Sequence, residues 1–359
     1  MPLPNLKFLQ QKGFSLIELM ISITIGLLLL AALTTLFVGQ SKSRLELDKS
    51  NRMIDNGRYA LDLLSENLSM AGFFAELDPY TLTVYPTTDA SFNPCSTTAT
   101  DIEKALPWHV QGYNAATSTS TIAPPPTCLP STIKAGSDIL VVRRANTTPV
   151  AAASANAGTT FLQVSLCVPK NGVAESVYRV QKAPATYNLS KKTCTTSNSG
   201  PMTDLRRVLV QIYFIDSNNL AGDGVPTLKM AELDESSNFI ITPIVEGIEY
   251  LQVDYGIDGF DTDADGIPDR FNAYNIPPDV DGAFNGSYIA CTACNENQWA
   301  HVVSVKINLL SRNLEATQGY TDSSTYRLGT AGTVSPGGAY KRHAYTQVIR
   351  LTNPSSRKE

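Results

Sequence analysis

The sequence predicts an α+β protein in which a long N-terminal helix, apolar and then amphipathic, precedes a large antiparallel β-rich domain. Two observations indicate this class. Proline is absent from Phe14 to Leu77, so one helix can extend through the transition from apolar to mixed sequence. After Gly72, short apolar runs alternate with stretches rich in Ser, Thr, Asn and Pro, a pattern typical of strands joined by long loops.

The first helical half, Phe14 to Val38, contains a single ionisable side chain, Glu18. As a helix its 25 residues span ~37 Å, enough to cross a bilayer. The preceding residues include Lys7 and Lys12 but no acid, which predicts that this short segment stays in the cytoplasm and the C-terminal domain lies outside. The apolar run is too long for a cleaved secretory signal, so we expect it to be retained.

The second helical half carries apolar residues at heptad spacing. Leu47, Ile54, Leu61 and Leu68 recur every seven residues, with Leu64 and Ala71 between turns. We expect the helix to continue to about Ala71, with a weak point at Asn56 and Gly57, where glycine costs ~1 kcal/mol. The predicted organisation is a leader at 1–13, a membrane-spanning half at 14–38, an amphipathic half at 39–72 and a β-rich domain at 73–359.

The N-terminal motif resembles a known family. Lys12-Gly13-Phe14-Ser15-Leu16-Ile17-Glu18 before an apolar run looks like the class III leader of type IV pilins and type II secretion pseudopilins. Further stretches resemble minor pilins of the PilW type: Asn56 to Leu64, Met70 to Phe73, Gly224 to Leu228 and Val245 to Gly256. The helix departs from many major pilins in having no proline, so the resemblance does not imply local melting there.

The resemblance implies several properties. In the family, a prepilin peptidase cuts after the glycine and methylates the new amine, which corresponds to Gly13 and Phe14 here. Removing the leader takes away two lysines, so the formal charge of −5 would become −7. Glu18 can be a tolerated residue near the membrane interface; the family instead implies that it pairs with the Phe14 amine of a neighbouring subunit and sets axial register.

The domain after Gly72 is expected to form one antiparallel sheet system. Clear alternation at Val303, Val305, Ile307 and Leu309 supports a strand there. The uncharged stretches Asn114 to Pro126 and Asn146 to Thr160 are expected to be surface loops. The predicted strands are Asp138 to Arg143, Phe161 to Cys167, Val177 to Gln181, Val208 to Ile215, Thr227 to Glu232, Phe239 to Ile257 with a break at Pro243, His301 to Leu310, and Tyr345 to Leu351.

Six cysteines in an exported domain are compatible with three disulfides, although sequence alone cannot choose the pairing. Sequential pairing would join Cys95 to Cys128, Cys167 to Cys194 and Cys291 to Cys294, and is favoured only because short loops close readily. A redox CxxC is the competing interpretation of the last pair, but no βαβ pattern surrounds it. Zinc is less favoured, since a second CxxC or a His pair is missing.

An acidic loop predicts a calcium site. Asp261, Asp263 and Asp265 alternate before Gly266, with Asp269 following and the carbonyl of Ile267 as a further ligand. Asn272 stands where an EF-hand would need Glu, so the loop resembles the DxDxDG loops of thrombospondin repeats and dockerins. The alternative is a solvated acidic turn. Asp279 and Asp281 are weaker candidates.

Composition and motifs favour a structural protein. Net charge −5 argues against nucleic-acid binding, and His109, His301 and His343 are scattered without a catalytic motif, so no enzyme activity is expected. We expect an inner-membrane protein with a periplasmic domain, later part of a surface pilus, whose partners are other pilins and minor pilins, the prepilin peptidase and the membrane. Two alternatives stay open: a type II secretion pseudopilin, and a pilus-tip adhesin for an unnamed surface ligand.

Overall fold

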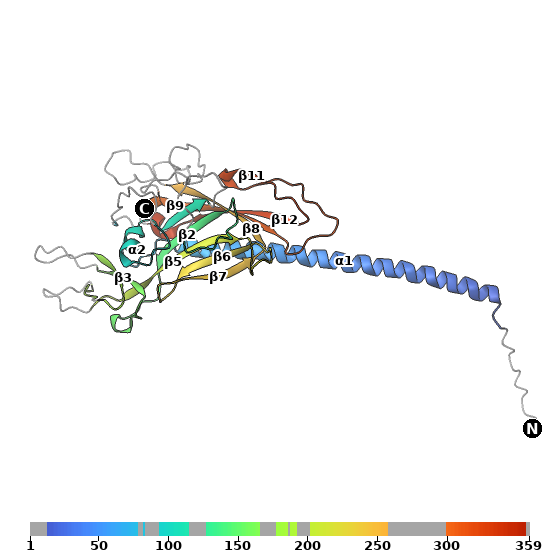
Figure 1. Ribbon diagram of the computed structural model, residues 1–359, viewed down its shortest axis with the longest axis horizontal. Helices are drawn as coiled ribbons and strands as arrows, with labels where there is room; N and C mark the ends of the chain where they lie inside the picture. The colour runs from blue at the N-terminus through green and yellow to red at the C-terminus, as the bar shows by residue number, and fades with distance from the viewer. Residues whose placement is uncertain are drawn as a thin grey trace, which may run out of the picture. The chain divides into compact units, whose positions relative to one another are not determined.

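The computed structural model describes residues 13–77, 82, 93–114, 127–165, 177–185, 187–191, 202–257 and 299–356, and confirms the α+β class (Figure 1). Helix α1 (Leu16–Ser69) comes first and is 54 residues long. The β-rich part contains α2 (Ala99–Ala105), β1 (Val110–Asn114), β2 (Asp138–Ala145), η2 (Ala152–Ser154), β3 (Thr160–Val164), β4 (Tyr178–Lys182), β5 (Leu205–Asp216), β6 (Thr227–Leu233), β7 (Phe239–Glu246), β8 (Ile248–Ile257), β9 (Val302–Arg312), β10 (Tyr326–Arg327), η3 (Gly329–Ala331), β11 (Thr333–Val334), β12 (Arg342–Arg350) and α4 (Thr352–Ser356).

The chain divides into two compact units, Met1–Asn51 and Arg52–Glu359. Helix α1 contributes to both units, so its turns after Arg52 belong with the strands. The change from helix to strands near residue 72 is therefore not the limit of the β-rich unit.

Within the second unit, α1 buries one stripe of side chains. Leu61 and Leu68 of the predicted heptad series and the intervening Leu64 are buried, and Ala71 just beyond the helix joins the same core. Earlier along the helix the buried positions are Met53, Gly57 and Ala60, whereas Ile54 is half-buried and Leu47, in the first unit, is exposed. The helix ends at Ser69, and the turn after it reaches Gly72, which adopts φ +70°, a left-handed conformation that glycine favours, and donates its N–H to the carbonyl of Arg143.

Two antiparallel sheets form the β-rich unit. The seven-stranded sheet has the order β1-β2-β5-β3-β4, with β6 pairing β5 and β7 pairing β6. The three-stranded sheet has the order β12-β9-β8, and a small β10-β11 pair stands apart. A central hydrophobic cluster joins the α1 stripe to side chains from both larger sheets. Figure 1 shows the later turns of α1 among the strands of this unit.

The strand predictions hold with shifted boundaries, except at one place. The predicted break at Pro243 is wrong, because Pro243 lies inside β7 and the chain turns instead at Gly247, whose φ is +77°. A Cβ on Gly247 would lie 2.8 Å from the carbonyl oxygen of Arg312, so the turn needs glycine both for its conformation and for space. Strand β1 and helix α2 were not predicted.

Candidate processing and docking sites

The residues of the predicted processing site lie at the start of α1. Gly13 and Phe14 precede the helix and are exposed, and an added Cβ at Gly13 would meet no heavy atom within 4 Å. The helix is initiated by Ser15, whose carbonyl oxygen accepts the N–H groups of Glu18 at 3.0 Å and Leu19 at 3.1 Å. Glu18 therefore lies in the first turn, where a carboxylate is favourable beside the positive end of the helix dipole.

The turns that follow present apolar side chains without cover. Leu16, Ile17, Leu28 and Phe37 are among the exposed large apolar residues of this half, and α1 is long and apolar enough to cross a membrane. Such a surface is unfavourable in water and suits lipid or other apolar helices.

A glycine and a tyrosine dock α1 onto the three-stranded sheet. The ring of Tyr345 on β12 lies over Gly57, where an added Cβ would overlap the ring. The Tyr345 hydroxyl donates to the main-chain carbonyl of Ile54 at 3.2 Å. Gly57, which looked like a weak point of the helix, is thus the position that lets an aromatic ring approach the helix backbone.

Further polar contacts extend this docking surface along α1. Asn56 donates to the carbonyl of Glu246 in β7 at 3.1 Å. Near the other end, Asn353 donates to the carbonyl of Ala71 at 3.2 Å. The helix is therefore held at both ends of its buried stripe, by β7 and by the segment after β12.

Side chains, rather than a main-chain ladder, join the two sheets beside β8. The Ser137 hydroxyl accepts the Leu251 N–H at 3.0 Å and donates to the Leu251 carbonyl at 3.2 Å. The Asp138 carboxylate accepts the Val253 N–H at 2.8 Å. Burial, reinforced by Asp254 nearby and opposed by the Val253 hydrogen bond, raises the pKa of Asp138 to about 7. The junction therefore contains a carboxyl group that titrates near neutral pH.

A buried ion cluster fixes the start of β12. Arg342 contacts Glu249 at 2.6 Å and Asp322 at 2.7 Å, and all three side chains are almost fully buried. The guanidinium of Arg312 lies 3.9 Å from the centroid of the Tyr340 ring and donates to the carbonyl of Gly224 at 2.7 Å. Loops distant in sequence are thereby held at one end of the three-stranded sheet.

Two family models match the chain. The model described as Type IV Pilus-assembly protein W matches residues 212–353, and the prokaryotic N-terminal methylation motif matches residues 9–34. The chain therefore combines a prepilin-type N-terminal motif with a region similar to PilW, called the PilW region below. No curated protein and no solved structure shows a significant match. The resemblance to the PilW type and to prepilin leaders, predicted from the sequence, is confirmed.

The PilW region contains much of the geometry above. It runs from within β5 through β12, so it includes Tyr345, the β8 side of the sheet junction and the buried ion cluster. The methylation motif includes Gly13, Phe14 and Glu18. The two matches together support an association with type IV pilus assembly.

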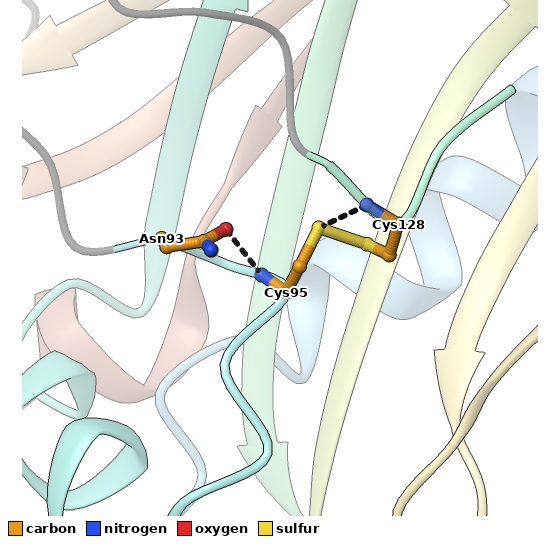
Figure 2. Close-up of a disulfide and its surroundings, with 3 residues drawn as sticks. All are labelled: Asn93, Cys95 and Cys128. Carbon is orange, nitrogen blue, oxygen red and sulfur yellow. Dashed lines mark hydrogen bonds between the residues drawn. A yellow bond between two sulfur atoms is a disulfide. The ribbon is translucent and has the colours of Figure 1, made fainter. Parts of the chain in front are cut away.

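A disulfide outside the PilW region joins residues that flank α2 and β1 in the sequence. Cys95 and Cys128 are bonded, with an S–S distance of 2.08 Å, which agrees with sequential pairing for these two residues (Figure 2). The Asn93 side chain accepts the Cys95 N–H at 3.0 Å, and the Cys128 N–H points at the Cys95 sulfur at 2.9 Å. Cys167, Cys194, Cys291 and Cys294 lie outside the described residues.

The predicted calcium ligands, Asp261, Asp263, Asp265, Ile267 and Asp269, also lie outside the described residues, as do Asp279 and Asp281. Within the part of the chain that the structure describes, no group of three or more His, Cys, Asp or Glu side chains is arranged to hold a metal ion.

Two buried basic side chains lie beside β1: His109 just before this strand and Arg143 on β2. Both ring nitrogens of His109 face main-chain carbonyls, of Val302 at 2.6 Å and of Pro107 at 3.2 Å, and burial lowers its pKa to about 4. Arg143 donates to the Trp108 carbonyl and to the side chain of Gln111, both at 2.7 Å. The partners of Arg143 satisfy its guanidinium in place, whereas the neutral His109 ring has one N–H and donates to one of its two carbonyls at a time.

Proposed function

We propose that this chain is a minor pilin-like subunit that takes part in type IV pilus assembly by priming, capping or incorporation into the fibre. In this proposal the first half of α1 lies in the inner membrane before assembly and in the helical bundle of the pilus afterwards, and the β-rich unit is periplasmic and then on the cell surface. The observation that carries the proposal is the combination of a prepilin-type N-terminus with a PilW region in one chain.

Processing would occur between Gly13 and Phe14, and the new amine would be methylated. The accessible backbone there supports this, because Gly13 lies before the first helical turn and has no side chain to obstruct a peptidase. The partner in this step is a prepilin peptidase.

Glu18 would set axial register by pairing with the Phe14 amine of a neighbouring subunit. Its position in the first turn of an otherwise apolar, uncovered helix supports this role. A carboxylate there is costly in lipid unless it is near an interface or paired, so a partner amine would favour the assembled state.

The test compares Glu18→Ala with Ser22→Ala, which removes a polar side chain from the next turn without changing charge. Both variants should be processed to a mature chain beginning at Phe14, by intact mass, and reach the membrane at wild-type levels or above. Glu18→Ala should then be depleted about tenfold or more in sheared filaments, whereas Ser22→Ala should not. Wild-type incorporation of Glu18→Ala would reduce Glu18 to a tolerated anchor residue.

A secretion pseudopilin would carry the same leader. The PilW match favours the pilus over the secretion machinery. Deleting the gene should abolish or reduce surface filaments and leave type II secretion intact; the reverse pattern would select the pseudopilin. Adhesion to a surface ligand remains a prediction from the Ser-, Thr- and Asn-rich composition.

A further inference from the structure

The outer strands of the two sheets differ in how their main-chain edges are protected. On β8, Ser137 and Asp138 cap the outward N–H groups of Leu251 and Val253. On β7, Pro243 occupies a position whose nitrogen faces away from β6 and so removes an outward donor, and the pairing with β6 shifts register next to it. Proline and register irregularities are common protections of exposed edges against unwanted pairing.

Strand β12 has neither protection. Its register with β9 is unbroken from Arg342 to Arg350, and it contains no proline. Beyond its two ends, Lys341 accepts from Asn313 at 3.1 Å and Leu351 donates to Val303 at 2.9 Å. Because N–H and C=O groups alternate in direction along a strand, the odd-numbered residues face β9 and the even-numbered ones face outward.

Between Arg342 and Arg350 at its two ends, the outward residues form a regular, uncharged row. Ala344, Thr346 and Val348 are exposed, and their outward N–H and C=O groups have no main-chain partner among the described residues. The side chains of the odd-numbered residues Tyr345 and Gln347 lie on α1. They donate to the carbonyl of Ile54 and to the hydroxyl of Ser65, respectively. The open edge of β12 therefore runs beside the helix over these turns.

We propose that the outer edge of β12 pairs with an extended strand of a neighbouring pilin-like subunit, adding a fourth strand to the three-stranded sheet. The row of outward N–H and C=O groups is complementary to an extended backbone, and the small uncharged side chains at Ala344 and Thr346 leave room for one. The assignment of the pairing strand to a neighbouring pilin-like subunit rests on the proposed function. In that proposal neighbouring subunits pack around α1, and β12 is the strand that lies on α1.

The experiment uses the full-length chain in cells, with a photoreactive amino acid in place of Val348. Illumination should give a crosslink whose second component is identified by mass as a pilin-like subunit. Ala344→Pro removes an outward N–H without breaking a β9 hydrogen bond and should weaken the crosslink about tenfold. Ile241→Pro is the matched control. It removes an outward N–H from the β7 edge, which Pro243 already protects, and should leave the crosslink unchanged.

Folding is checked by the membrane level and protease resistance of each processed variant. If Ala344→Pro fails this check, Ala344→Lys replaces it, placing a charge on the edge without proline. An undiminished crosslink in the folded variant, or no crosslink to a pilin-like subunit in the parent, overturns the proposal. Wild-type protein in sheared filaments without a β12 crosslink would refute the edge pairing alone, whereas its absence from filaments would refute the proposed function.

Discussion

Gly57 and Tyr345 show how one missing side chain positions a helix on a sheet. Alanine is normally favoured over glycine in a helix by ~1 kcal/mol. At Gly57, however, the ring of Tyr345 occupies the space that an alanine Cβ would need. The two residues lie in elements far apart in sequence, so their contact reports on tertiary packing rather than on helix propensity.

Gly57→Ala is expected to lower the free energy of unfolding of the β-rich unit. Overpacking costs roughly 1–3 kcal/mol, which exceeds the ~1 kcal/mol gained in propensity. Chemical denaturation of a fragment starting at Arg52 measures this. In the background of Tyr345→Ala, which removes the ring, the same substitution should become neutral or stabilising; a loss of equal size in both backgrounds would contradict the packing account.

Asp138 makes the sheet junction sensitive to pH. Its folded pKa of about 7 is above the ordinary 3.8, so between these values the folded state holds a proton that the unfolded state has lost. The free energy of unfolding from this group therefore falls as pH rises through that window and levels off above it. The groups near it are Asp254, the Tyr255 hydroxyl and the N–H of Val253.

Asp138→Asn should remove that dependence, because the amide oxygen still accepts the Val253 N–H and cannot ionise. We expect the variant to be more stable than wild type by roughly 1–4 kcal/mol at about pH 8, and close to wild type at about pH 4. Denaturation curves across this range test it. Ser137→Ala should lower stability by a similar amount at every pH, and parallel pH profiles for wild type and Asp138→Asn would refute the assignment.

At the scale of elements, α1 serves two environments. Its first half exposes apolar side chains throughout, whereas the later turns bury Met53, Leu61, Leu64 and Leu68 within the β-rich unit. The later turns of the helix are thus part of the core of the β-rich unit, and its first half has the length and composition of a membrane anchor.

A fragment starting at Gly72 should therefore fail to fold, although one starting at Arg52 should be soluble. Losing four buried apolar side chains at ~1.5–3 kcal/mol each removes ~6–12 kcal/mol, comparable with the whole stability of a domain, ~5–15 kcal/mol. Soluble yield and near-ultraviolet circular dichroism compare the two. A cooperative unfolding transition in the shorter fragment would show that the strands suffice.

Sequence patterns predicted the elements whose signals are local. The helix follows from missing proline and heptad spacing, and the processing motif occupies a few consecutive residues. Strand β1 escaped prediction because Gln111 and Gly112 give it no apolar alternation; its burial depends on Arg143 and Tyr255 from other strands. Pro243 was misread as a break because an edge strand tolerates proline on its outer side, a fact visible only with the sheet order.

Long-range partners had no local signal either. The contact between Tyr345 and Ile54 joins residues 291 positions apart, and the Glu249–Arg342–Asp322 cluster combines three separate segments. In the sequence alone, nothing distinguishes the charged residues of those segments from ordinary surface charges, because their contacts depend on the fold.

At the scale of the whole molecule, we propose that calcium binds the loop from Asp261 to Asp269. Four carboxylates repel one another unless a cation intervenes, so calcium should raise the melting temperature of the Arg52 fragment, by a linkage of ~2.7 kcal/mol at 100 times the dissociation constant. Asp263→Ala with Asp265→Ala should abolish the shift, and magnesium should substitute poorly. Absence of calorimetric binding at about millimolar calcium would leave only an acidic turn.

The placement of β12 has a consequence for the timing of folding. With the periplasmic location proposed above for the β-rich unit, the apolar stripe of α1 crosses the membrane first. The strand carrying Tyr345 and Ile349, which covers part of that stripe, follows some 290 residues later. Contacts of such long sequence separation form slowly. Throughout that interval the helix would present an uncovered apolar face, so a chaperone or a partner helix that covers this face would be needed most before β12 has crossed the membrane.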